Sequence, residues 1–232
     1  MIKGYIFDYG ATLDTGGNHW GQVIWHAYRH LDIPITEDCY REAYVFAERK
    51  LGSEHIITPE DTFKNTLDKK LDIQLTYLNN IDSLNYTSIQ QDKIRSLLLE
   101  YLYNNVRKET SRSAEVLAEL KKSYPLALVS NFYGNIKVVL EEMGLDVYFQ
   151  DIIESATVGV RKPDPLIYNI GVKTLDMPAE NIMVVGDSLG KDILPALKTG
   201  CQATWLKGES WKEETIMPPK NVKIITSLTQ LL

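Results

Sequence analysis

Short apolar runs alternate with amphipathic helical patterns through the second half of the chain, and this alternation constrains the fold more than any other feature. The runs at residues 126–129, 151–154, 182–185, 203–206 and 222–225 are predicted strands, because short apolar segments bounded by turn residues are typical of buried strands. Strands that are joined by helices form parallel sheets with helices on both faces. The sequence therefore predicts an α/β fold built on a parallel sheet.

A long stretch of helical patterns precedes this alternation. Residues 2–7 form one more predicted strand, and from about residue 16 to residue 107 the patterns are helical, with hardly a strand among them. We expect three or four helices that pack as a small bundle. The sequence thus predicts two domains, an α/β core of residues 1–15 and 108–232 and an all-helical insertion of residues 16–107. Such an insertion lies over the strand ends and can act as a lid there.

Two details of the helical patterns make sharper predictions. Thr58, which is followed by Pro59 and two acidic residues, is predicted to be the N-cap of one helix. The apolar positions within 94–102 and within 113–120 indicate two separate helices, one on each side of the predicted domain boundary.

Polar side chains follow three of the predicted strands, and a cation lies in a loop between them. In chain order the residues are Asp8, Ser130, Asn131, Lys162, Asp187 and Asp192. The carboxyl ends of parallel strands meet at one edge of a sheet, where open α/β sheets bind their ligands. We therefore expect these six side chains to lie around one cleft.

The chemistry of this set is that of phosphate transfer. Carboxylates gathered in one cleft repel one another unless a cation joins them, and hard oxygen ligands suit Mg²⁺, which shares its coordination with a phosphate. Lys162 would neutralise an anionic group, and Ser130 would donate a hydrogen bond to its oxygens. Asp8 would then attack phosphorus and form an aspartyl phosphate. The set predicts a Mg²⁺-dependent hydrolase that acts on a small phosphorylated metabolite.

In these residues the chain resembles the haloacid dehalogenase (HAD) superfamily, over nearly its full length. The four family motifs are matched at Asp8 and Thr12, at Ser130, at Lys162 with Pro163, and at Gly186, Asp187 and Asp192. The resemblance implies a Rossmann-like core with a helical cap inserted between the first and second motifs.

The resemblance also implies a role for each matched side chain. Asp8 would be the nucleophile and a Mg²⁺ ligand, and Asp187 and Asp192 would hold the metal directly or through water. Ser130 and Lys162 would bind the phosphoryl group. Thr12 and Asn131 are expected to belong to the same phosphate site.

One motif position departs from the family pattern. Family phosphatases carry a second Asp two residues after the nucleophile as general acid and base, whereas this chain has Gly10 there and Ala11 in place of the usual glycine. The backbone carbonyl of Gly10 remains an expected metal ligand, because the family uses the carbonyl at that position. A general acid is typically worth about 10²–10⁴-fold in rate. Asp14, His19 and Tyr9 are the nearby side chains that could replace it.

Three functions remain open after this departure. The first is a phosphatase of low activity, or one restricted to good leaving groups such as those of acyl or aryl phosphates. The second is hydrolysis of a carbon–phosphorus bond, which in the family needs a cap lysine; Lys50 and Lys64 are present, and neither is marked by its surroundings. The third is a catalytically impaired protein that binds a phosphorylated ligand or a protein partner. The family's halide-releasing branch works without metal, and the pair Asp187 and Asp192 argues against it.

Composition limits the expected partners. The 232 residues carry a formal net charge of −6 and contain no dense block of Lys or Arg, so neither nucleic acid nor an anionic membrane is an expected partner. Cys39 and Cys201 are only two and far apart in the chain, so no disulfide framework is implied. The apolar segments are too short to span a membrane, and a cytoplasmic location is expected.

Overall fold

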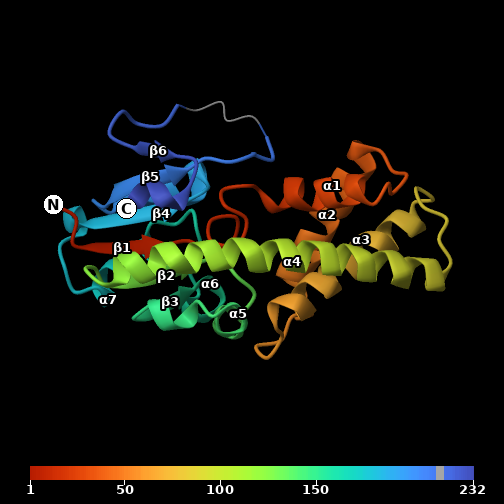
Figure 1. Ribbon diagram of the computed structural model, residues 1–232, viewed down its shortest axis with the longest axis horizontal. Helices are drawn as coiled ribbons and strands as arrows, with labels where there is room; N and C mark the ends of the chain where they lie inside the picture. The colour runs from red at the N-terminus through yellow and green to blue at the C-terminus, as the bar shows by residue number, and fades with distance from the viewer. Residues whose placement is uncertain (213–216) are drawn as a thin grey trace.

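The computed structural model describes residues 1–212 and 217–232, and its centre is a six-stranded sheet in the order β3-β2-β1-β4-β5-β6 (Figure 1). The strands are β1 (Gly4–Phe7), β2 (Leu126–Ser130), β3 (Asp151–Glu154), β4 (Ile182–Gly186), β5 (Gln202–Leu206) and β6 (Lys223–Ile225). Every neighbouring pair in this order is parallel. The predicted parallel α/β sheet is therefore confirmed.

Helices fill the connections between the strands. Four long helices lie between β1 and β2, namely α1 (Trp20–His30), α2 (Glu37–Ser53), α3 (Phe63–Asn80) and α4 (Ser88–Lys121). The later connections contain α5 (Ile136–Met143), α6 (Ser155–Val158), α7 (Leu166–Thr174) and α8 (Leu194–Lys198). Short helical turns cover Asp146–Tyr148, Ala179–Asn181 and Leu228–Leu231, and a π-helical turn covers Leu189–Ile193.

Alternate residues of the central strand pack on opposite faces of the sheet. Phe7 belongs to the apolar cluster that includes Val139 of α5 and Leu117 of α4, whereas Ile6 packs with Ile167 and Tyr168 of α7. Successive side chains of a strand point to opposite faces, and all four residues of β1 are buried. Helices therefore cover β1 on both sides, and its free end becomes the place where a polar residue can face a ligand.

The first three helices gather beyond the strand ends, and α4 runs from this group back along the sheet (Figure 1). The two helices predicted within 94–102 and 113–120 are one continuous helix of 34 residues. That prediction is wrong: residues 88–121 contain neither Gly nor Pro, so no helix-breaking residue interrupts the helix between the two apolar segments. The predicted domain boundary at residues 107 and 108 falls inside this helix, and the division into two domains stays a prediction.

The start of α3 also differs from the prediction. Thr62 is the N-cap, and its side chain accepts a hydrogen bond from the backbone N–H of Asn65 at 3.1 Å. Thr58 does not begin the helix, because its backbone N–H donates to Asp61 Oδ2 at 2.7 Å and closes a turn before it. Lys69 Nζ holds the same carboxylate at 2.5 Å. The acidic residue that favoured an early helix start is therefore used to end the preceding loop.

Among the residues described, no helix combines the length and the apolar character needed to cross a bilayer.

Candidate active site

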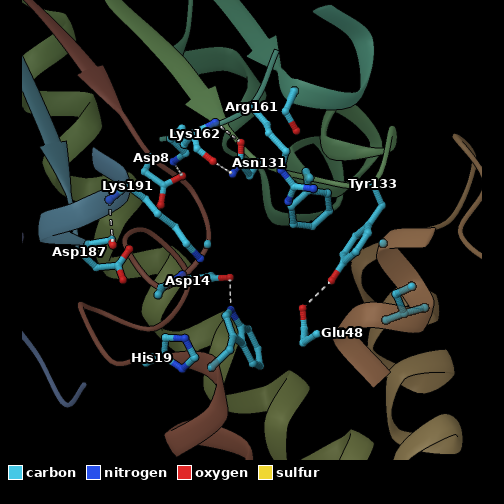
Figure 2. A pocket seen from close by; sticks show the side chains of 18 of the residues that line it. Asp8, Asp14, His19, Glu48, Asn131, Tyr133, Arg161, Lys162, Asp187 and Lys191 are labelled. Carbon is cyan, nitrogen blue, oxygen red and sulfur yellow. Dashed lines mark hydrogen bonds and ion pairs between the residues drawn. The ribbon is translucent and has the colours of Figure 1, made fainter. Parts of the chain in front are cut away.

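A cavity of about 1130 Å³ lies between the strand ends and the helices α1–α3 (Figure 2). Its strand-end side includes Asp8, Gly10, Asp14, Asn131, Lys162, Asp187 and Asp192. Its helical side includes Trp20, Glu48 and Lys70, with Tyr133 from the loop after β2. The strand register explains the first side: Phe7 pairs with Leu128 and Val185, so the three central strands end within two residues of one another at the same edge.

Lys162 is the centre of the strand-end side. Its ammonium lies 2.5 Å from Asp8 Oδ1 and 2.7 Å from Asp192 Oδ1. All three residues are buried, with exposed fractions of 5 % or less. Tyr168 donates a further hydrogen bond to Asp192 Oδ1 at 2.8 Å, and the Ser188 N–H donates to Asp192 Oδ2 at 2.9 Å. These contacts fix the lysine between two carboxylates from opposite ends of the sequence.

Asp187 adds a third carboxylate to this group. One oxygen each of Asp8, Asp187 and Asp192 lie within 4.8 Å of one another. Thr12 Oγ1 lies 3.1 Å from Asp187 Oδ1 and 3.3 Å from Asp8 Oδ2. Burial, followed by the charges of Asp192 and Asp8, raises the pKa of Asp187 well above its ordinary value. One ammonium for three carboxylates leaves negative charge that a cation would stabilise.

The donor set fits a hard divalent cation. Three carboxylates that can each offer an oxygen within 4.8 Å of the others match the preference of Mg²⁺ for oxygen ligands. Burial raises the pKa of Asp8 as well, and the ammonium of Lys162 opposes that rise. A bound dication would favour the ionised form of all three groups. Gly10 lines the cavity next to them, and its carbonyl stays a predicted ligand.

The predicted phosphate-binding residues occupy different places. Lys162 and Asn131 line the cavity, whereas Thr12 and Ser130 are buried beside it. Both polar atoms of the Asn131 side chain are used on the backbone of Lys162: Nδ2 donates to its carbonyl at 3.0 Å and Oδ1 accepts from its N–H at 2.8 Å. Asn131 therefore positions the lysine, and direct phosphate binding by Asn131 or Ser130 stays a prediction.

Gly10 leaves open space where the family pattern has an acid. A Cβ built on Gly10 would meet no atom within 4 Å, and Gly10 is not among the glycines with left-handed backbone. The next residue, Ala11, does have a left-handed backbone, with φ of 68°. Asp14 Oδ1 accepts the Ala11 N–H at 2.6 Å and supports this turn. At this position the chain thus forms a turn held by Asp14 and carries no acidic side chain.

The three candidate replacements for the missing acid differ in what they contact. The Tyr9 hydroxyl is buried in the apolar cluster with no hydrogen-bond partner among the described residues, and burial raises its pKa well above the ordinary value. His19 caps α1, and its Nδ1 accepts the Gly21 N–H at 3.0 Å. Burial, aided by the charge of Lys191, lowers the pKa of His19 to about 4. Neither side chain is placed to supply a proton near neutral pH.

Asp14 is the remaining candidate for the missing acid, and its carboxylate also holds two neighbouring groups in place. Its Oδ2 accepts a hydrogen bond from Trp20 Nε1 at 2.9 Å, so its two oxygens hold the turn at Ala11 and the indole of Trp20. Burial raises the pKa of Asp14 to about 7, against these two hydrogen bonds. Asp14 therefore connects the strand-end side of the cavity to its helical side.

Sequence reasoning missed Lys70, Glu48 and Tyr133. Lys50 and Lys64, the two lysines named from the sequence, contact aromatic rings instead. Lys50 Nζ lies over the ring of Phe46, and Lys64 Nζ lies over that of Tyr103. The sequence contains a signal that could have identified Lys70, because this lysine occupies a position on the buried, mostly apolar face of α3. That face is Phe63, Thr66, Leu67, Lys70, Leu71, Gln74, Leu75 and Leu78. A lysine at such a position needs a buried partner.

The comparisons with known proteins give the family of the chain. Residues 54–206 match the family model described as haloacid dehalogenase-like hydrolase, which is more than half of the chain. The protein therefore belongs to the haloacid dehalogenase-like hydrolases. Asp8 precedes the matched range, so its place in the site depends on the strand register given above.

Its curated relatives include phosphatases. The chain is 30% identical over 124 residues to the 5-amino-6-(5-phospho-D-ribitylamino)uracil phosphatase of Escherichia coli, covering 51% of this chain and 50% of that protein. It is 36% identical over 105 residues to a phosphoglycolate phosphatase of Vibrio cholerae, covering 44% and 43%. A glyceraldehyde 3-phosphate phosphatase of Methanothermobacter thermautotrophicus is 26% identical over 186 residues, covering 75% and 82%. The chain spans about half the length of the first two.

Solved structures share the fold over nearly the whole chain. A dehalogenase with an intermediate complex has a TM-score of 0.65 at 16% identity, covering 99% of this chain and 95% of that one. A putative HAD hydrolase from Bacillus subtilis bound to magnesium has a TM-score of 0.58 at 17% identity, covering 99% and 96%. These likenesses establish a HAD-like, Rossmann-like fold for this chain.

Proposed function

We propose that this HAD-like hydrolase is a Mg²⁺-dependent phosphatase that acts on a small phosphorylated metabolite through an aspartyl phosphate on Asp8. The observation that carries the proposal is the group of three carboxylates, Asp8, Asp187 and Asp192, of which the first and the last pair with the buried ammonium of Lys162. Its negative excess calls for a dication, and the dication and lysine together can accept a phosphate dianion. The phosphatase relatives support the same reaction class.

In the first step the Asp8 carboxylate attacks phosphorus. A bond forms between an Asp8 oxygen and phosphorus, and the bond from phosphorus to the leaving oxygen breaks. Lys162 orients the carboxylate, since its ammonium already lies 2.5 Å from Asp8 Oδ1. Asn131 holds the backbone of Lys162 in place. Bound Mg²⁺, held by Asp8, Asp187 and Asp192, would neutralise charge on the phosphoryl oxygens.

In the second step water attacks phosphorus and the bond to Asp8 breaks, which releases inorganic phosphate and restores the carboxylate. Both steps need a proton transfer, to the leaving oxygen first and from the attacking water later. Gly10 supplies no side chain for either transfer, so each proton would be exchanged with solvent or with Asp14, which lines the cavity and whose pKa burial raises to about 7. We expect leaving groups that need little protonation, those of aryl and acyl phosphates, to react fastest.

Carbon–phosphorus hydrolysis is less well supported. In the family that reaction needs a cap lysine, and the lysine of the helical side that lines the cavity is Lys70. Its ion pair with Glu48, at 2.7 Å, raises the pKa of Lys70 against the effect of burial. An ammonium that stays protonated does not act as an amine nucleophile.

The test is a Mg²⁺-dependent activity screen of wild type and Asp8→Asn on aryl, acyl and alkyl phosphates and on phosphonates. Wild type should hydrolyse aryl and acyl phosphates, and Asp8→Asn should lose at least about 10⁴-fold of that rate because no carboxylate attacks. Asp176→Asn, at an exposed carboxylate, is the matched control. Unchanged turnover by folded Asp8→Asn would refute the nucleophile. Binding of beryllium fluoride without any turnover would favour the impaired, ligand-binding alternative.

A further inference from the structure

The helical side of the cavity contains a charge-balanced polar group that the proposed reaction does not use. Lys70 Nζ of α3 lies 2.7 Å from Glu48 Oε1 of α2. The Tyr133 hydroxyl, from the loop after β2, donates to Glu48 Oε2 at 3.1 Å. Figure 2 shows Tyr133 and Glu48 pointing toward each other across the cavity from Asp8 and Asp187. We call Glu48, Lys70 and Tyr133 the distal triad.

Two aromatic rings enclose the ammonium of the distal triad. Lys70 Nζ lies 5.9 Å from the ring centroid of Trp20 and 5.8 Å from that of Tyr133. The Lys70 side chain is 11% exposed, and that of Glu48 is 33% exposed. Part of the Glu48 side chain is therefore accessible, although its Oε1, the oxygen beside Lys70, is buried, and the ammonium lies between the two rings.

A purely structural role explains this arrangement poorly. A lysine on the apolar stripe of α3 loses hydration, and an apolar residue of similar volume is often as stabilising as a buried ion pair. All three residues of the triad line the cavity that contains Asp8. A wall that presents an acceptor, a donor and two aromatic faces is typical of a binding site for a polar ligand.

We propose that the distal triad is the leaving-group subsite and that it selects an uncharged, hydroxyl-bearing alcohol, so that the substrate is a polyol or sugar monophosphate. A hydroxyl can donate to Glu48 and accept from Lys70 at once, which no carboxylate can do. The rings of Trp20 and Tyr133 would pack against the carbon chain. This inference rests on the proposed function, because it places the phosphate at Asp8.

Charge decides against a second anion at this position. The carboxylate of Glu48 already neutralises Lys70, so a substrate carboxylate would approach an accessible carboxylate and gain no net attraction. Arg49, Arg161 and Lys191 also line the cavity, so carboxylated phosphate esters are the natural competing class. The subsite offers them no net attraction, so the preference depends on Glu48 as much as on Lys70.

The test compares matched ligands that differ in one terminal group. Ribitol 5-phosphate ends in CH₂OH, and 5-phosphoribonate carries a carboxylate there; glycerol 3-phosphate and 3-phosphoglycerate form a shorter pair. Calorimetry with Asp8→Asn and Mg²⁺ gives each Kd without turnover. We expect the alcohol of each pair to bind at least about tenfold more tightly. Equal binding, or tighter binding of the acids, would overturn the inference.

Three variants, each combined with Asp8→Asn, distinguish a role of the distal triad in ligand recognition from a purely structural role. Glu48→Gln keeps the shape of the side chain and leaves the ammonium uncompensated, so 5-phosphoribonate should become the tighter ligand. Lys70→Met should weaken ribitol 5-phosphate about tenfold. The double variant Glu48→Gln/Lys70→Met leaves no buried charge unpaired and should bring the two Kd values together. Lys69→Met is the control, since Lys69 pairs with Asp61 at 2.5 Å and is not part of the cavity wall.

The outcomes distinguish this inference from the proposed function. If wild type hydrolyses p-nitrophenyl phosphate while Glu48→Gln leaves the preference unchanged, the subsite is wrong and the phosphatase stands. If no phosphate ester binds and p-nitrophenyl phosphate is not hydrolysed, the subsite and the proposed phosphatase function are both wrong. A preference that inverts in Glu48→Gln and persists in Lys69→Met supports the subsite, because a merely structural ion pair would not reverse it.

Discussion

Two buried lysines face one cavity from opposite sides, and their surroundings differ. Lys162, at the strand ends, pairs with Asp8 and Asp192, and Asp187 lies close by as a third carboxylate. Lys70, on the helical side, pairs with the single carboxylate of Glu48. The first group has an excess of negative charge, and the second is balanced.

The difference in charge separates two tasks. An excess of buried carboxylate is stabilised by a further cation, and a site of that kind can hold a dication and a phosphate. A balanced pair offers a directional donor and acceptor without net charge, which suits recognition of a neutral hydroxyl. In the proposed function the same residue type would therefore take part in reaction chemistry at one side and in selection at the other.

The largest effect that we expect comes from restoring an acid to the strand-end side. Gly10→Asp places a carboxyl group in space where a Cβ meets no atom within 4 Å, on a backbone that is not left-handed. The kcat for ribitol 5-phosphate or glycerol 3-phosphate should rise by about 10²–10⁴-fold, because the alkoxide leaving group then receives a proton. Steady-state kinetics with Mg²⁺ measure this gain.

Gly10→Asn is the matched control, because asparagine has the shape of aspartate but no titratable proton. This variant should show no gain in kcat. The preference for alcohols over carboxylates should remain as in wild type, because it belongs to the other side of the cavity. A correctly folded Gly10→Asp with unchanged kcat on alkyl phosphates would show that the missing acid does not limit the reaction.

The next effect is a difference between the two lysines in how much each contributes to the free energy of unfolding. Lys162→Met leaves the buried carboxylates of Asp8 and Asp192 without their ammonium, and breaking such a pair typically costs about 3–5 kcal/mol. Lys70→Met leaves only Glu48, whose side chain is 33% exposed, and should cost about 1–2 kcal/mol. Urea unfolding in EDTA gives both values. Added Mg²⁺ should restore stability to Lys162→Met, because it replaces the lost positive charge.

Lys69→Met again serves as the control, since its pair with Asp61 is partly exposed and exposed pairs contribute about 0–1 kcal/mol. Mg²⁺ should change neither Lys69→Met nor Lys70→Met relative to wild type. If Lys70→Met proved as costly as Lys162→Met, or if Mg²⁺ failed to rescue Lys162→Met, the contrast between an unbalanced and a balanced group would not hold.

The two sides also differ in how well the sequence predicted them. Asp8 and Asp187 directly follow strands, and Lys162 and Asp192 lie in the connections that come after β3 and β4. Because the parallel sheet places its strand ends at one edge, local patterns were enough to predict that these residues lie together. The distal triad could not be assembled in this way. Its members lie on α2, α3 and a loop, and helix packing rather than sheet register decides which of their side chains meet.

The errors in the predicted helix ends also arise from contacts between residues that are distant from the local pattern. Thr58 and Thr62 both carry the signals of an N-cap, and a tertiary contact decided between them, because Asp61 is held by Thr58 and Lys69. Long helices are also hard to trace across polar stretches, as the continuous α4 shows. Propensity sets which local structures are possible, and contacts distant in sequence select one of them.

The last effect, which is small for each unit of pH, concerns Asp14, which joins the two sides through Ala11 and Trp20. Burial raises its pKa to about 7, from an unfolded value of about 3.9. Between these values the folded state keeps a proton that the unfolded state releases. The contribution of Asp14 to stability is therefore fully present below about pH 4 and falls as pH rises to about 7, by at most about 1.4 kcal/mol per unit.

Urea unfolding from pH 4 to pH 8 in EDTA should show this loss in wild type, with Asp8 and Asp187 adding to it because burial raises their pKa values too. Asp14→Asn removes the titration and should give a flatter profile, although an amide facing Trp20 Nε1–H lowers stability at every pH. Asp176→Asn, at an exposed site, should keep the wild-type slope. An Asp14→Asn profile parallel to that of wild type would mean that Asp14 is ionised throughout, and that the two sides are joined by a permanent charge.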